Sequence, residues 1–82
     1  MIDVTLLGPL SEAAGTRKTD ATASTIGELI DVLSERYGTL FKKRAKSCRI
    51  VVNGTPIQFI KGKKTELKTG DEVAFLVPIG GG

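Results

Sequence analysis

The sequence contains no histidine and no tryptophan, and it has a single cysteine, Cys48. Histidine is the commonest general base at neutral pH and a common metal ligand, so its absence argues against catalysis by this chain alone. One cysteine cannot form an internal disulfide or a cysteine-based metal cluster. Three Phe and one Tyr leave few side chains on which nucleic-acid bases could stack. We therefore expect neither an enzyme nor a resident metal.

Long hydrophobic runs are also missing. No stretch has the roughly 20 apolar residues that cross a bilayer, and residues 1–4 lack the basic and apolar segments of a secretory signal. We expect a cytoplasmic protein that does not enter a membrane. The 82 residues, of which 40% are hydrophobic and 26% charged, favour one small globular domain.

The clearest local pattern predicts a helix over residues 26–37. Thr25 and Glu28 form a capping box, in which the threonine oxygen accepts an amide hydrogen and the glutamate reaches back. Gly38 is well placed as the carboxyl-terminal cap. One apolar stripe at helical spacing comprises Ile26, Leu29, Ile30, Leu33 and Tyr37.

Alternating and continuous apolar residues predict the strands. Residues 2–6 alternate as a half-buried strand does, and residues 18–23 are a weaker candidate for its hairpin partner. Residues 49–52 lead into Asn53-Gly54, a pair typical of tight hairpin turns, so residues 57–60 are expected to form the returning strand. Residues 73–77 form the strongest predicted strand.

The order of these elements predicts the fold class. Two strands, a helix, a strand, a short strand and a last strong strand indicate an α+β fold in which a mixed sheet wraps over one main helix, the β-grasp (ubiquitin-like) arrangement. Residues 1–78 would form this domain, because Pro78 lacks an amide hydrogen and ends the last strand. Residues 79–82 would form a flexible glycine tail.

The final residues, Gly80-Gly81-Gly82, allow two interpretations. They are either a frayed end or a reactive terminus. A carboxylate becomes a good acyl donor once it is converted to an acyl-adenylate, and glycine lets the backbone enter a narrow channel beside ATP. Residues 77–82, if extended, would reach roughly 20 Å at ~3.3 Å per residue.

The closing segment, residues 67–82, resembles that of the MoaD/ThiS-type sulfur carriers. In that family a Gly-Asp-Glu-Val turn, here residues 70–73, precedes the last strand, a proline and a terminal Gly-Gly. Further upstream the resemblance includes residues 10–15, 25–29, 52–54 and 57–60.

This resemblance implies a non-enzymatic carrier that binds no cofactor itself. A MoeB/ThiF-type adenylyltransferase, related to ubiquitin-activating enzymes, would use ATP to adenylate Gly82, and a sulfur donor protein would convert that terminus to a thiocarboxylate. The similarity is closest to the molybdopterin synthase small subunit, whose tail enters a MoaE-type large subunit. By position, Gly80 and Gly81 belong to the tail, and the partner-docking surface comprises Leu7, Ile57 and Leu76. Leu6 and Leu7 are adjacent, as are Phe75 and Leu76, so a strand must turn one of each pair outward.

Several alternatives stay open. At Val77 the molybdopterin branch usually has the first of two prolines, so a ThiS-like carrier for thiamine biosynthesis also fits. A third candidate is a protein modifier joined to lysines through Gly82. The cluster of Lys and Arg in residues 42–49 raises a fourth, a nucleic-acid-binding module. We favour a solvated loop or helix end for this cluster, since no aromatic residues are interleaved.

Three smaller expectations concern packing. Leu40 and Phe41 should both return to the core. Cys48 should be a packing residue, although the neighbouring Arg49 could favour its thiolate. Asp71 and the acid that follows it should serve the turn rather than form a catalytic pair.

Overall fold

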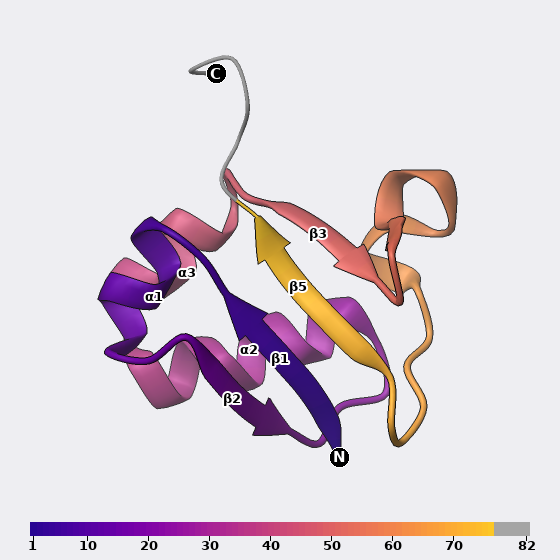
Figure 1. Ribbon diagram of the computed structural model, residues 1–82, viewed down its shortest axis with the longest axis horizontal. Coiled ribbons are helices and arrows are strands. Elements are labelled where there is room, and N and C mark those ends of the chain that lie inside the picture. Colours follow the sequence, from indigo (N-terminus) through magenta and orange to yellow (C-terminus); the bar gives the residue numbers. More distant parts are fainter. Residues whose placement is uncertain (77–82) are drawn as a thin grey trace.

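The computed structural model describes residues 1–76 and shows a five-stranded sheet whose helices lie on one face (Figure 1). The sheet order is β2-β1-β5-β3-β4, with β1 and β5 parallel and the other neighbours antiparallel. The strands are β1 (Ile2–Leu6), β2 (Lys18–Ala21), β3 (Arg49–Val52), β4 (Thr55–Pro56) and β5 (Glu72–Leu76). The helices are α1 (Pro9–Ala14), α2 (Ile26–Tyr37) and α3 (Thr39–Ala45), with 3-10 turns η1 (Ile57–Phe59) and η2 (Gly62–Lys64). The predicted mixed sheet over one main helix is confirmed.

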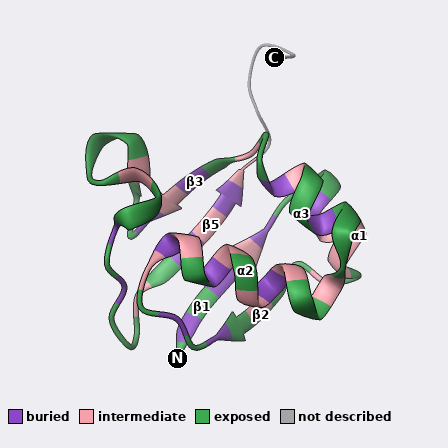
Figure 2. Ribbon diagram, turned by 180° about the vertical axis from the view of Figure 1, so that it is seen from behind, coloured by how far each residue is buried: buried purple, intermediate pink, exposed green. Residues whose placement is uncertain are grey.

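The main helix, α2, crosses the covered face of the sheet (Figure 2). Its Ile26, Leu29 and Leu33 are fully buried, while Ile30 and Tyr37 from the predicted stripe are half-buried. Each fully buried leucine contributes about 1.5–3 kcal/mol of hydrophobic free energy. The remaining core residues are Ile2, Val4, Leu6, Leu10, Ala21, Ala23, Phe41, Ala45, Ile50, Val52, Leu67, Val73 and Phe75.

The ends of α2 follow the predicted capping pattern with one difference. Thr25 Oγ1 accepts the Glu28 amide hydrogen at 3.2 Å, as expected. The Glu28 carboxylate accepts from the amide of Ser24, one residue before the cap, at 3.3 Å. Gly38 closes the helix with φ 99°, a backbone conformation that glycine adopts without strain, and its amide donates to the carbonyl of Ser34 at 2.8 Å.

The predicted strand over residues 57–60 is wrong. The Asn53-Gly54 turn is present, with φ 50° and 86°, but the returning strand β4 is only Thr55–Pro56. Pro56 has no amide hydrogen and cannot extend the ladder as a donor, and the chain turns into η1 instead.

The prediction for Leu40 is also wrong. Phe41 is buried, but Leu40 is 51% exposed because both lie on α3, where consecutive side chains point about 100° apart.

Two strand limits also differ from prediction. Strand β2 ends at Ala21, and β5 starts at Glu72, one residue early. The predicted last residue of β5, Val77, lies outside the described residues.

Within residues 1–76, no helix has the length and apolar character needed to cross a membrane.

A small network of hydrogen bonds joins the β3–β4 turn to the start of β5. Asp71 accepts from the Lys68 amide at 2.8 Å and from the Asn53 side-chain amide at 3.2 Å. The Asn53 side-chain oxygen in turn accepts from the Glu72 amide at 2.9 Å. These bonds confirm the turn role of Asp71. The bond from the Lys68 amide, followed by that from Asn53, lowers the pKa of the Asp71 carboxyl.

We predict that Asp71→Asn removes part of the acid sensitivity of the fold. Because the folded pKa is lowered, the ionised carboxylate stabilises the fold above the unfolded pKa of about 3.9, and this stabilisation is lost as the pH falls through the folded value. Urea unfolding of both proteins at neutral pH and at about pH 2 measures this. The variant should be less stable at neutral pH, and the difference should shrink in acid. An equal difference at both pH values would contradict the role of the charge.

Candidate functional site

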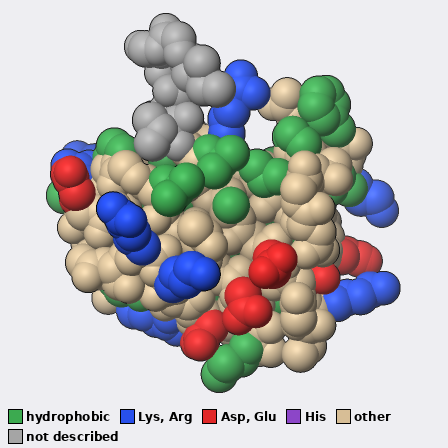
Figure 3. Space-filling view, viewed as in Figure 1, with side chains coloured by type: hydrophobic (Ala, Val, Ile, Leu, Met, Phe, Trp, Pro, Cys, Tyr) green, Lys and Arg blue, Asp and Glu red, His purple; other side chains and the backbone are tan. Residues whose placement is uncertain are grey.

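The open face of the sheet carries an apolar end where β1 and β5 finish. The Leu7 amide donates to the Phe75 carbonyl at 3.2 Å, so the parallel pairing continues past β1 and holds Leu7 beside the end of β5. Leu7 is 38% exposed and Leu76 is half-buried, whereas Leu6 and Phe75 are fully buried. The prediction that one residue of each adjacent pair turns outward is confirmed. Figure 3 shows hydrophobic side chains gathered over this end of the face.

The third predicted docking residue, Ile57, joins this region from the side. It opens η1 and is half-buried against the core. With Leu76 it lines a hollow of about 470 Å³ beside β3, which Leu7 does not line. Leu76 is therefore the residue common to the two parts of the apolar surface.

Sequence reasoning missed three apolar residues at or near this surface. Val51 and Ala74 are register partners on β3 and β5, and both are half-buried. With Leu76 they line a separate, smaller hollow of about 310 Å³ on the open face. Both residues alternate with core residues along their strands, so each points outward. An apolar residue at an outward strand position was therefore the sequence signal that could have identified them. Phe59, at the end of η1, is 75% exposed; the wrongly predicted strand concealed its position.

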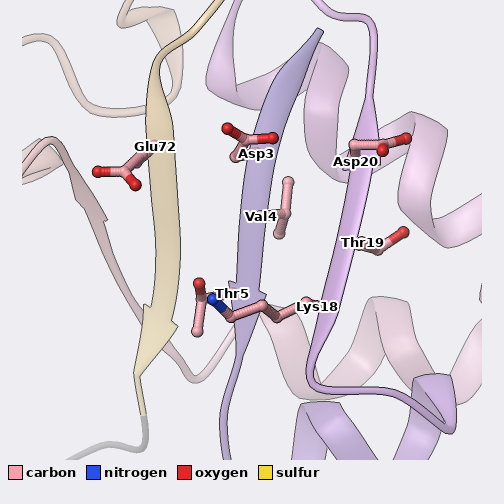
Figure 4. A pocket seen from close by; sticks show the side chains of 7 residues that line it. All are labelled: Asp3, Val4, Thr5, Lys18, Thr19, Asp20 and Glu72. Carbon is pink, nitrogen blue, oxygen red and sulfur yellow. The ribbon is translucent and has the colours of Figure 1, made fainter.

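Acidic residues form a row across the same face, farther from the apolar end. Asp3 lies opposite Glu72 in the parallel pair and opposite Asp20 in the antiparallel pair. Figure 4 shows Asp3 between the other two, with Lys18 farther along the strands. Like charges on neighbouring strands repel one another. Within residues 1–76, no three acids, cysteines or histidines are arranged to hold a metal ion.

Cys48 is half-buried and packs against the core, as expected. Burial raises the pKa of its thiol, so the neutral thiol predominates at neutral pH. The sulfur behaves as a small apolar group here.

The basic cluster has one structural member. Arg44 donates to the Pro9 carbonyl at 2.8 Å and lies 4.0 Å from the Glu12 carboxylate, which ties α3 to α1. Lys42 and Lys43 are exposed on α3, and Lys46 is exposed at its end. The lysines of the cluster thus lie on the exposed surface of helix α3 and its carboxyl-terminal cap, as expected for a solvated helix end.

The predicted tail residues Gly80, Gly81 and Gly82 lie outside the described residues. The last described residue, Leu76, belongs to the apolar end of the open face.

Comparison with known proteins identifies the family. The model of the ThiS family matches residues 4–82. The chain belongs to the ThiS family. This ubiquitin-like family includes sulfur carriers, and the mixed sheet over one main helix is its β-grasp fold.

Individual relatives differ in their named roles. A protein of Archaeoglobus fulgidus named "Putative sulfur carrier protein" is 32% identical over 81 residues, which cover 90% of this chain and 92% of that one. The solution structure of small archaeal modifier protein 1 from Methanosarcina acetivorans has a TM-score of 0.87 at 28% identity and covers 99% of this chain and 95% of that one. A chain in the complex of subunits 1 and 2 of molybdopterin-converting factor from Helicobacter pylori 26695 has a TM-score of 0.70 at 27% identity. The match covers 99% of this chain and 97% of that one.

The two leucines at the end of β1 provide a matched test of the site geometry. Leu6→Ala should lower the free energy of unfolding by about 2–5 kcal/mol because it leaves a cavity in the core. Leu7→Ala should cost less than about 1 kcal/mol, since its side chain is largely outside the core. Urea unfolding measures both values. Equal losses would show that Leu7 is a packing residue and does not belong to an available surface.

Proposed function

We propose that this ThiS-family chain is a sulfur carrier whose reacting residue is Gly82, at its carboxyl terminus. The Gly82 carboxylate attacks the α-phosphate of ATP on an activating enzyme, and pyrophosphate leaves. The terminal sulfur of a donor persulfide then attacks the acyl-adenylate, and AMP leaves. A second thiol cleaves the resulting acyl disulfide, which yields the thiocarboxylate and a disulfide.

The observation that carries this proposal is the position of the apolar end relative to the tail. Leu7 and Leu76 lie together on the open face, and Leu76 is six residues before Gly82. An apolar surface on a small protein commonly contacts a partner. With residues 1–78 as the body and 79–82 as the tail, residues 77–82 would reach roughly 20 Å into that partner when extended. Leu7, Ile57 and Leu76 would dock the body while Gly80, Gly81 and Gly82 enter the active site.

The chemistry of the described residues supports activation by a separate enzyme. Residues 1–76 contain no histidine, and their acidic row lies on an open sheet surface. An adenylyltransferase of the MoeB/ThiF type would supply the ATP site, and a sulfur donor protein would supply the persulfide.

Similarity to subunit 1 in the H. pylori complex favours a molybdopterin precursor as the sulfur recipient, with a MoaE-type subunit as the second partner. Similarity to the M. acetivorans modifier favours one further function, attachment through Gly82 to lysines of other proteins. A ThiS-like role in thiamine biosynthesis would use the same thiocarboxylate. All three functions require the same first step at Gly82.

Deletion of Gly81 and Gly82 tests that common step. With the activating enzyme from the same host, the full chain should support ATP-dependent exchange of pyrophosphate. With the shortened chain the exchange should be at least about 100-fold slower, because the terminal carboxylate that accepts the adenylyl group is misplaced. The thermal unfolding curve should not change, since the buried core residues all belong to residues 1–76. Unchanged exchange by the shortened chain would contradict the proposal.

The recipient is distinguished by a separate measurement. Tryptic peptides from the native host in which a target lysine carries residues 69–82, the segment that follows the last trypsin site at Lys68, would favour the modifier function. Loss of molybdopterin synthesis in cells lacking the chain, restored by the full chain but not by the shortened one, would favour the carrier function in that pathway.

A further inference from the structure

Cationic side chains surround two adjoining hollows on the side of the molecule formed by α2, α3 and η2. The first hollow has a volume of about 230 Å³ and lies beside Ile30. The second is the hollow of about 470 Å³ beside Ile57. Lys46 and Lys63 line both and form their common wall. We call these two hollows and their cations the basic groove.

The basic groove has a large excess of positive charge. Lys42 lines the first hollow and Arg49 the second, which gives four cations with the two shared lysines. Asp31 is the one carboxylate among the residues that line it. Within residues 1–76, the one ion pair joins Arg44 to Glu12, and no lysine ammonium group donates a hydrogen bond to a protein atom. These cations are therefore available to an external anion.

The floor of the groove is apolar. Ile30 and Ile57 are half-buried, and Cys48 lines the second hollow with its thiol held neutral by burial, which raises its pKa. An occupant that presented only charge would leave this floor exposed to water. Aliphatic side chains of an occupant would bury it, at about 25 cal/mol for each Å² removed from water.

The walls of the groove are held in place by the fold. Phe41 and Ala45 anchor α3 in the core. A Cβ added at Gly27 would lie 3.4 Å from the Lys63 carbonyl oxygen, so η2 lies directly against the first turn of α2. The Thr65 carbonyl accepts from the Ile26 amide at 3.1 Å and fixes the end of η2 there. Such preorganisation lowers the entropic cost of binding.

We propose that the basic groove binds an acidic segment of a partner protein in which carboxylates alternate with aliphatic side chains. The carboxylates would pair with Lys42, Lys46 and Lys63, and the aliphatic groups would cover Ile30 and Ile57. A nucleic acid fits this groove less well, because no aromatic side chain lines it for base stacking. The groove shares Ile57 and Leu76 with the proposed docking surface, but binding of the acidic segment requires no reaction at Gly82.

The chain offers a matched pair of charge reversals. Lys46→Glu with Lys63→Glu changes the shared wall of the groove. Lys43→Glu with Lys64→Glu makes the same change in net charge close by, on α3 and η2, at exposed residues that do not line either hollow. All four side chains are exposed, so neither double variant should alter the thermal unfolding curve by more than a few degrees. Lys46→Gln with Lys63→Gln provides a milder groove variant in case the reversal does not fold.

The test uses a fluorescent synthetic peptide that alternates glutamate and leucine, with glutamate–serine and lysine–leucine peptides as controls. Anisotropy titrations at low and physiological salt should show that the wild type binds the glutamate–leucine peptide most tightly. The groove reversal should weaken this binding by at least about tenfold, and the matched reversal by less than about threefold. The glutamine pair should give an intermediate loss. Equal losses from the two reversals would overturn the proposal.

Two other occupants are outcomes of the same experiment. If a single-stranded oligonucleotide binds more tightly than the peptide, and the groove reversal abolishes that binding, the groove is a nucleic-acid site and the proposal is wrong. If sedimentation shows concentration-dependent self-association that only the groove reversal removes, the occupant is the acidic row of a second copy, and the proposal is equally wrong. The chain shortened by Gly81 and Gly82 should bind the glutamate–leucine peptide as tightly as the wild type, which separates this test from the test of Gly82.

Discussion

The parallel pairing of β1 with β5 is the constraint on which the rest of the structure depends. It places the first and last strands of the described chain at the centre of one sheet, from Asp3 opposite Glu72 to Leu6 opposite Phe75. Parallel neighbours cannot be joined by a tight turn, so the chain between them must cross the sheet. Helix α2 lies within this crossing, and its buried leucines belong to the same core cluster as the inward residues of both strands.

The same pairing organises the candidate site. Because the two strands run in the same direction, Leu7 and Leu76 lie at the same end of the open face, where both strands finish. The last described residue is thus part of an apolar surface, and the proposed reactive terminus lies six residues farther along the chain. The acidic row crosses the same strands toward their other ends, and the basic groove lies beyond β3, around α3 and η2. Charge of opposite sign therefore occupies different sides of a very small domain, which favours partners that approach in defined orientations.

Regular periodicity made much of the fold predictable from sequence. The stripe on α2, the cap at Thr25 and the alternation in β1 are local signals, and each element formed with the expected bounds. The errors arose at local features that the apolar pattern alone did not reveal. Residues 57–60 are apolar enough for a strand, but Pro56 ends the ladder. Leu40 is apolar but lies on the outward side of α3, a helix too short to show a clear period.

The site was predictable to a similar extent. Alternation within β1 and β5 was enough to expect one outward side chain in each adjacent pair, Leu6 with Leu7 and Phe75 with Leu76. Ile57 and Leu76 line one hollow, and Lys46 and Lys63 line two hollows together, because distant segments pack side by side, which a single sequence does not reveal.

The central claim is that Gly82 carries sulfur, and intact-mass spectrometry of the chain purified from its native host tests it most directly. The account predicts a population whose mass is increased by the replacement of one oxygen with sulfur, with the change confined to the peptide that ends in Gly82. This population should disappear when the activating enzyme is deleted. A terminus that remains an ordinary carboxylate while the host is actively making sulfur-containing cofactors would contradict the account.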